Sequence, residues 1–294
     1  MTLAVSVVVP TRDRPEALRR CLRSLAGQTH PPAEVIVIDD GSREPVQTRN
    51  ALTVLDGATL LRLEGAGPAA ARNAGARAAR GDVICFTDDD CVAAPDWVAR
   101  LAPRAAEAGA AAGHTRPAPG AGPPARATQA LINHLQAWAD RQGSPSAGFA
   151  PACNLAVTRE VFRRVGFDES YPGAAGEDRD WAARAAASGA APRFVPEAEV
   201  VHHVDDTALA FLRRQFRYGR GAAQFRREAL ADGPPRRLGT PAFYLGLIRA
   251  GFAAGPAAGL LVLLAQPATA AGVAAERLSR SAATRRRGRK PAPR

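Results

Sequence analysis

The feature that most constrains this chain is a repeated unit, in which a short apolar run ends in a polar turn and a helix-like segment follows. The first four runs are rich in Val, Ile and Leu and lie at Leu3–Val9, Val35–Ile38, Leu60–Leu63 and Val83–Phe86. Such runs are typical of strands buried on both faces of a parallel sheet. Their alternation with helices predicts an α/β fold, and ligands of such sheets bind beyond the carboxyl ends of the strands.

Three polar turns follow strands of this predicted sheet, so we expect them at one edge. They are Pro10-Thr11, Asp39-Asp40 and Asp88-Asp89-Asp90. Three adjacent carboxylates repel each other unless a cation or hydrogen-bond donors compensate, which favours Mg²⁺ or Mn²⁺ with Asp88 and Asp90 as the pair of ligands. A solvated acidic turn is the alternative. Asp39 or Asp40 could accept from a ribose hydroxyl or a base N–H, or simply cap a helix.

A glycine-rich loop after the third strand offers a different interpretation. Gly65-x-Gly67-x-x-Ala70 matches a dinucleotide-binding fingerprint, with acidic residues about 20 positions later. That fingerprint normally follows the first strand of a fold, and Pro68 interrupts it here. The alternative is that the loop positions Arg72 and Asn73 towards phosphates or a sugar.

Two further groups could carry chemistry. Glu177 and Asp178 begin a predicted helix, where a carboxylate could act as a general base or could simply complement the helix dipole. His202 follows a short apolar stretch and could complete an acidic metal site, although a single histidine is more often structural. The four cysteines form no CxxC pair, so we expect reduced thiols rather than a zinc or redox motif.

The formal net charge of +11 is concentrated at the C-terminal end. Eight basic residues and one acidic residue lie between Glu276 and Arg294, which leaves the rest of the chain close to balance at +4. This distribution argues against nucleic-acid binding by the folded body. Before the tail, Ala250–Ala275 is apolar enough to span or lie on a bilayer, and it is flanked by basic residues on both sides. The two basic flanks favour a re-entrant hairpin or an in-plane pair of helices over a single span, with a soluble helical appendage as the alternative.

Taken together, the motifs resemble those of a family 2 glycosyltransferase of the GT-A fold. The resemblance covers roughly Val5 to Gly221 and rests on the order of five pieces: Val5–Arg14, Val35–Ser42, Ala71-Arg72-Asn73-x-Gly75, Phe86–Asp90 and Gly176-Glu177-Asp178. The Q-x-x-R-W signature of processive enzymes is absent in strict form, which argues against a polysaccharide synthase.

The resemblance implies roles for individual residues. The nucleotide-sugar donor would be bound by Pro10, Thr11, Arg12, Arg14, Asp39, Asp40, Arg72, Asn73, Asp88 and Asp89. The divalent metal, Mn²⁺ or Mg²⁺, would be held by Asp90, Asp88 and His202, with Asp90 as the direct ligand of a DxD motif. Asp178, supported by Glu177, would be the catalytic base of an ED motif. The implied reaction is an inverting, metal-dependent transfer from a UDP-, dTDP- or GDP-sugar to an acceptor hydroxyl.

The implied architecture is a mostly parallel central sheet flanked by helices, with a helical C-terminal extension. We expect a transferase domain over residues 1–235 (donor half 1–115, acceptor half 116–235), an apolar membrane-associated segment over 236–275, and a disordered Arg-rich tail over 276–294. The acceptor would be a glycan or a lipid-linked molecule of cell-envelope or glycolipid synthesis, at the cytoplasmic side of an anionic membrane, with the protein peripheral or C-terminally anchored. The alternatives are a non-catalytic sugar-nucleotide-binding module and an oxidoreductase that uses the Gly65–Ala70 loop.

Overall fold

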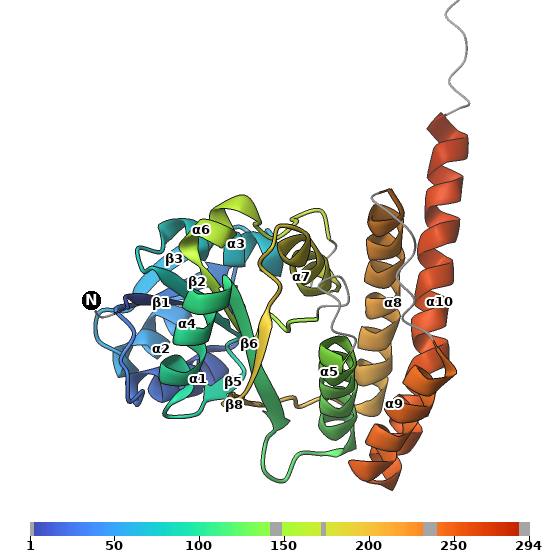
Figure 1. Ribbon diagram of the computed structural model, residues 1–294, viewed down its shortest axis with the longest axis horizontal. Helices are drawn as coiled ribbons and strands as arrows, with labels where there is room; N and C mark the ends of the chain where they lie inside the picture. The colour runs from blue at the N-terminus through green and yellow to red at the C-terminus, as the bar shows by residue number, and fades with distance from the viewer. Residues whose placement is uncertain (1–2, 142–148, 172–174, 232–239, 288–294) are drawn as a thin grey trace, which may run out of the picture.

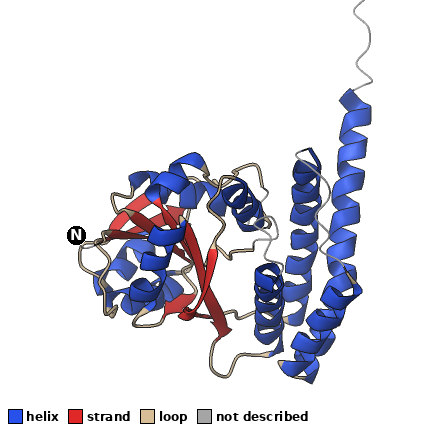
Figure 2. Cartoon of the chain, in the orientation of Figure 1, coloured by secondary structure: helices blue, strands red, loops and turns tan. Residues whose placement is uncertain are grey.

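The computed structural model describes residues 3–141, 149–171, 175–231 and 240–287. These residues form an eight-stranded sheet with helices on both faces, beside a separate layer made only of helices (Figures 1 and 2). The expected mixed, mostly parallel sheet and the helical C-terminal extension are therefore both present.

The N-terminal half of the sheet is parallel, as the alternating pattern predicted. Its strand order is β3-β2-β1-β4, and its elements are β1 (Val5–Thr11), α1 (Pro15–Ala26), β2 (Glu34–Asp40), α2 (Pro45–Ala51), the 3₁₀ turn η1 (Leu52–Val54), β3 (Thr59–Leu63), α3 (Pro68–Ala78) and β4 (Val83–Thr87). Pairing of Thr11 with Asp39 in the ladder brings the polar ends of β1 and β2 side by side.

Burial on both faces explains why these strands are continuously apolar. Val7 and Val9 of β1 face one core, which α1 and α4 cover, whereas Val8 faces a second core on the opposite side of the sheet. Helix α1 contributes Leu18 and Leu22 to the first core at helical spacing. Asp13, just before α1, accepts hydrogen bonds from the backbone and side chain of Arg43.

The C-terminal half of the sheet is mostly antiparallel and continues the order as β7-β6-β8-β5. Its elements are β5 (Cys91–Ala93), α4 (Trp97–Ala108), β6 (Ala110–Pro117), β7 (Asn154–Thr158), α6 (Arg159–Arg164), α7 (Glu177–Ala187) and β8 (Arg193–His202). Neither β5 nor β6 was predicted from the sequence pattern. The alanine-rich strand β6 lies between β7 and β8 in the sheet, and its first three alanine side chains are buried.

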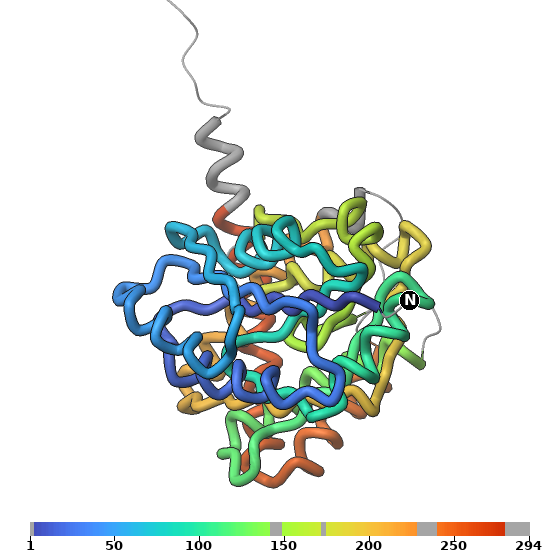
Figure 3. The backbone as a smooth tube through the Cα atoms, turned by 90° about the vertical axis from the view of Figure 1, so that its left-hand side faces the viewer, coloured from blue at the N-terminus to red at the C-terminus, as the bar shows by residue number. Residues whose placement is uncertain are grey.

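The helical layer consists of α5 (Pro123–Arg141), α8 (Ala208–Ala231), α9 (Pro241–Ala253) and α10 (Pro256–Arg287). Figure 3 shows these helices behind the sheet domain. Glycines bring α8 and α10 into backbone contact: a Cβ added at Gly219 would lie 2.0 Å from the carbonyl oxygen of Thr269, and one at Gly272 would lie 2.0 Å from that of Phe216. Arg220 and Glu276 form an ion pair at 2.9 Å across the same contact.

The structure bears on two expectations about the C-terminal region, namely that it contains a pair of helices and that the tail is disordered. The apolar segment is divided between α9 and α10, with the break at Gly255 (φ +125°) and Pro256, while Pro267 lies inside α10. Helix α10 also continues to Arg287, so the first part of the expected disordered tail is helical. Residues 142–148 of the expected acceptor half, Arg236 and Arg237 before the apolar helices, and the end of the tail lie outside the described residues.

Candidate active site

The acidic turn after β4 is fixed to the end of β1 by its middle carboxylate. The Thr11 hydroxyl donates to Asp89 at 2.7 Å, and Arg14 donates to the same carboxylate at 3.1 Å. Asp89 is buried; its burial and the neighbouring charge of Asp90 raise its pKa to about 7, against the opposing effects of Arg14 and Thr11. Thr11, Arg14 and Asp89, which we expect to bind the donor, are joined to one another at this turn.

Asp90 lies beside His202, as the metal-site expectation required. Strands β5 and β8 pair Cys91 with His202, and this register places His202 Nε2 3.3 Å from an Asp90 carboxylate oxygen. Arg14 also reaches Asp90 at 2.8 Å. Burial lowers the pKa of His202, but the hydrogen bond and charge of Asp90 outweigh it and raise the pKa to about 9.

The ligand atoms of Asp90, Cys91 and His202 all lie within 4.8 Å of one another. His202 Nδ1 is buried and has no hydrogen-bond partner among the described residues. A carboxylate beside an imidazole suits a divalent ion such as Mn²⁺, so Asp90 and His202 fit the expected metal. Cys91 was not foreseen in this group, because nothing in the sequence aligns β5 with β8.

Asp88 is placed differently from the expected pairing with Asp90. Its carboxylate accepts from Arg72 at 2.8 Å, and Arg72 bridges to Glu177 at 3.1 Å. Among the described residues, Asp88 is not part of the cluster formed by Asp90 and His202. The guanidinium of Arg72 therefore decides the position of Asp88, because a buried cation requires compensating carboxylates.

Arg72 is the central cation of the site. Its side chain is buried on α3, its guanidinium lies 5.8 Å from the centre of the Phe167 ring, and its Nε has no hydrogen-bond partner among the described residues. It connects the turn after β4 to the start of α7, so it aligns the two acidic motifs that the sequence separates by nearly ninety residues. The carboxylate of Glu177 binds Arg72, which agrees with the supporting role that we expect for Glu177.

Asp178 sits in the first turn of α7, after Gly176 in the left-handed conformation (φ +101°). One carboxylate oxygen accepts from the backbone N–H of Arg179 at 2.7 Å. Burial and the charge of Glu177 raise the pKa of Asp178 to about 7, although Arg179 and Arg72 oppose the rise. A carboxyl that titrates near neutrality is suited to general-base chemistry.

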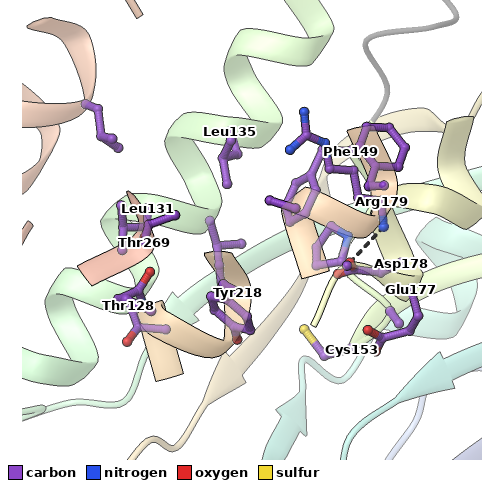
Figure 4. A pocket seen from close by; sticks show the side chains of 18 of the residues that line it. Thr128, Leu131, Leu135, Phe149, Cys153, Glu177, Asp178, Arg179, Tyr218 and Thr269 are labelled. Atoms are coloured by element: carbon purple, nitrogen blue, oxygen red, sulfur yellow. Dashed lines mark hydrogen bonds between the residues drawn. The ribbon is translucent and has the colours of Figure 1, made fainter. Parts of the chain in front are cut away.

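A cavity of about 300 Å³ opens in front of Asp178. Its lining includes Arg72, Asp88 and His202, so the three groups expected from separate motifs share one space. Figure 4 shows Asp178 and Glu177 at one side, with Thr128, Leu131 and Leu135 of α5 at the other. The contribution of α5, α8 and α9 to this cavity was not predicted, because their apolar positions have the same spacing as ordinary core positions.

Asp39 and Asp40 are used inside the fold. Asp39 is fully buried and accepts from the Ser42 N–H at 2.8 Å and from Arg62 at 2.7 Å. Asp40 accepts from the backbone N–H groups of Ala66 and Gly67 at 2.7 and 2.9 Å. The glycine-rich loop is thus bound to the β2 carboxylate.

Three remaining donor-site candidates have distinct surroundings. Asn73 is buried, and its amide donates to the Phe167 carbonyl at 2.9 Å and accepts from the Phe167 N–H at 2.9 Å. These bonds tie α3 to the loop before α7, and the expected contact of Asn73 with the donor stays a prediction. Pro10 is partly buried at the end of β1, and Arg12 is exposed beside Gly65.

Comparison with known proteins shows the fold type of this chain first and its family second. Over the whole fold the chain resembles a mannosyltransferase from Pyrobaculum calidifontis, solved in complex with GDP-Man and Mn²⁺, with a TM-score of 0.61 at 24% identity, covering 97% of this chain and 81% of the other. Glucosyl-3-phosphoglycerate synthase from Mycobacterium tuberculosis, solved with Mn²⁺ and UDP, matches with a TM-score of 0.57 at 18% identity, covering 75% and 78%. The fold is therefore of the GT-A type. The family model "Glycosyl transferase family 2" matches residues 6–166, and the chain belongs to that family.

Two relatives extend the match beyond the family model. A pre-mycofactocin glycosyltransferase of Mycobacterium tuberculosis is 31% identical over 235 residues, which is 74% of this chain and 47% of the relative. Glycosyltransferase AglE of Haloferax volcanii is 27% identical over 230 residues, which is 75% of this chain and 73% of the relative. The chain thus spans only about half the length of the mycobacterial relative.

Proposed function

We propose that this chain transfers a sugar from a nucleotide-diphosphate sugar to an acceptor hydroxyl, with inversion at the anomeric carbon. The observation that carries the proposal is the position of Asp178. Its carboxyl has a pKa of about 7 and shares a cavity with Asp88, Arg72 and His202. A single displacement requires a base for the acceptor hydroxyl and a group of residues that stabilises the departing diphosphate.

In the proposed reaction, Asp178 accepts the proton of the acceptor hydroxyl. The oxygen attacks the anomeric carbon from the face opposite the nucleotide, the bond to the diphosphate oxygen breaks, and the configuration inverts. Glu177 helps to keep the pKa of Asp178 near neutrality, and Arg72 fixes Glu177 and Asp88 in place. A covalent intermediate is not needed, because one base is sufficient for a single displacement.

The expected metal fits the residues present. Asp90 and His202 would hold a divalent cation, Mn²⁺ or Mg²⁺, through a carboxylate oxygen and an imidazole nitrogen. When bound, such an ion neutralises the negative charge that develops on a departing diphosphate. The binding of Mn²⁺ with GDP-Man or UDP by the structural neighbours supports a UDP-, dTDP- or GDP-sugar donor here.

The two alternative functions predict different behaviour. An oxidoreductase would need the backbone N–H groups of the glycine-rich loop for a pyrophosphate, but Ala66 and Gly67 already donate theirs to Asp40. A non-catalytic sugar-nucleotide-binding module would bind a donor and metal but show no turnover.

The test begins with a thermal-shift screen of nucleotide sugars with Mn²⁺, followed by transfer assays with the stabilising donor. Asp178→Asn should lower kcat by about 10²- to 10⁴-fold and leave donor affinity unchanged. In the native protein, kcat/KM should rise with pH through about 7, as Asp178 loses its proton. Asp56→Asn, on an exposed turn before β3, is the matched control and should change neither quantity. Unchanged transfer by Asp178→Asn would overturn the assignment of the base.

We further propose that the protein works at the cytoplasmic side of the cell membrane, peripherally attached through α9 and α10, in cell-envelope glycan or glycolipid synthesis. Pro256–Ser279 is long enough to cross a bilayer, and its most apolar 18-residue window has a mean hydropathy of 1.6, yet 33% of that window is buried inside the protein. Large apolar side chains remain exposed on these helices, namely Leu245, Phe252, Leu260, Leu263 and Leu264. Helices with an apolar outer face and an Arg-rich flank suit the interface of an anionic membrane.

This location can be tested with vesicles of phosphatidylcholine, with and without phosphatidylglycerol. The full-length protein should co-sediment with the anionic vesicles, and the double substitution Leu260→Ser and Leu264→Ser should release it. Val46→Ser, on the exposed face of α2, is the control and should not affect binding. Equal partitioning of the native protein and the double variant would contradict the proposal.

A further inference from the structure

The cavity in front of Asp178 has two chemically different ends. At the polar end lie the carboxylates of Asp88 and Asp178. At the other end the wall includes Leu131 and Leu135 from α5 and Phe243 and Leu247 from α9, with Thr128 and Thr269 beside Leu131. Leu131 and Leu135 are one helical turn apart and pack against the same apolar cluster as Phe243 and Leu247. A molecule that reaches Asp178 from the helical layer therefore passes along an apolar wall.

Helix α8 supplies a polar group between these two ends. Gln215, Tyr218, Ala222 and Phe225 line the cavity at intervals of three or four residues, so they share one face of the helix. The Gln215 side chain is only 5% exposed, and its amide nitrogen has no hydrogen-bond partner among the described residues. An unpaired buried donor is costly, so its presence in a cavity wall points to a ligand that brings an oxygen acceptor.

We propose that the acceptor is an amphiphilic alcohol, in which the carbon that carries the reacting hydroxyl is joined to an apolar chain or ring. The hydroxyl would lie at Asp178, an oxygen of the head would accept from Gln215, and the apolar part would lie along Leu131, Leu135, Phe243 and Leu247. This inference rests on the proposed function, because it names the acceptor class of the same site. It makes α9 a wall of the acceptor site in addition to a membrane-facing helix.

The main alternative occupant is a wholly hydrophilic glycan. Sugar hydroxyls placed against Leu135 and Leu247 would lose their hydrogen bonds to water without gaining others, which is unfavourable. A ligand with an apolar part instead gains free energy for each methylene group that leaves water. The chemistry of this wall therefore favours the amphiphile.

The experiment uses n-alkanols from butanol to decanol as probes, titrated calorimetrically into the full-length protein. Each added methylene should tighten binding by roughly threefold to fourfold until the cavity is filled, after which the affinity should level off. Nucleotide affinity is measured on the same protein with UDP or GDP and Mn²⁺. Nucleotide binding without chain-length dependence would overturn this inference alone, whereas loss of nucleotide binding would count against the proposed function.

Two substitutions separate the head from the chain. Leu135→Trp fills the apolar end and should abolish the dependence on chain length, whereas Leu245→Trp places the same side chain on the exposed face of α9 and should leave it intact. Gln215→Met keeps the volume of the side chain but removes the donor, so it should weaken every alkanol by a similar factor. If Leu135→Trp and Leu245→Trp behave alike, the alkanols bind elsewhere and the inference fails.

Discussion

The two regions that enclose the cavity are built by different physical means. At the sheet edge, charged groups hold each other at hydrogen-bond distance, with Arg72 joining Asp88 to Glu177 and Arg14 joining Asp89 to Asp90. In the helical layer, backbones touch at Gly219 and Gly272, and the wall of the cavity is largely apolar. The charged side of the cavity is therefore positioned by ion pairs, whereas the shape of its helical side depends on how closely α8 and α10 pack.

The largest expected effect is that of removing the positive charge of Arg72 from the sheet edge. Arg72→Met leaves Asp88 and the buried Glu177 without their cation, so the free energy of unfolding should fall by about 3 kcal/mol and transfer should be nearly lost. Urea denaturation measures the first quantity. Arg104→Met removes an exposed ion pair with Glu107 and should cost about 0.5 kcal/mol or less. Equal losses of unfolding free energy in the two variants would mean that the burial of Arg72 and its carboxylate partners adds nothing to stability.

A smaller effect is expected from separating the helices. Gly272→Ala places a methyl group against the Phe216 carbonyl, so α8 and α10 must move apart, at a cost of about 2 kcal/mol in thermal or urea unfolding. Gly27→Ala, where the added carbon meets its neighbours at an ordinary 3.6 Å, is the control. Nucleotide affinity should be unchanged in Gly272→Ala and alkanol affinity should fall, which would sharpen the division between the two regions. A parallel loss of both affinities would contradict that division.

The smallest expected effect is that of substituting Asp178, which lies where the two regions meet. This substitution should raise the free energy of unfolding, whereas the two substitutions above should lower it. The pKa of this carboxyl is about 7 in the folded protein and near 3.8 when unfolded. Above pH 7 both states are ionised and the folded state bears the cost of the buried charge, so Asp178→Asn should raise the free energy of unfolding by about 1–2 kcal/mol at pH 8. As the pH falls from 7 to 4, the folded native protein takes up the proton first and regains this stability, so the advantage of the variant should disappear. An advantage that persists at pH 4 would show that the gain has another cause.

Individual residues show how far the sequence could be interpreted. The parallel strands, the acidic turns and the start of α7 were predicted, because apolar runs that end in polar residues mark strand ends directly. Apart from the pairing of Asp90 with His202, the partners of these carboxylates were not predictable. Asp88 is held by Arg72 from α3, and Asn73 binds the backbone at Phe167; neither contact follows from the local sequence.

The strands β5 and β6 were missed for a related reason. β5 is three residues long, and β6 begins with Ala110-Ala111-Ala112, a pattern that shows neither alternation nor β-branching. Their pairing with β8 depends on contacts between segments distant in the sequence. That pairing places His202 beside Asp90, so half of the candidate metal site follows from a register that the local sequence does not encode.

The sequence by itself determined the order of elements, the family and the motifs that carry the chemistry. These depend on local patterns of burial and on residue types at fixed spacing, which a linear chain displays directly. Only the tertiary structure decided which charges pair, that Asp178 faces a cavity shared with α5, α8 and α9, and that this cavity has an apolar end. Those features arise from long-range packing, because a buried cation selects its carboxylates, and the closeness of two helices shapes the space between them, only after the chain has folded.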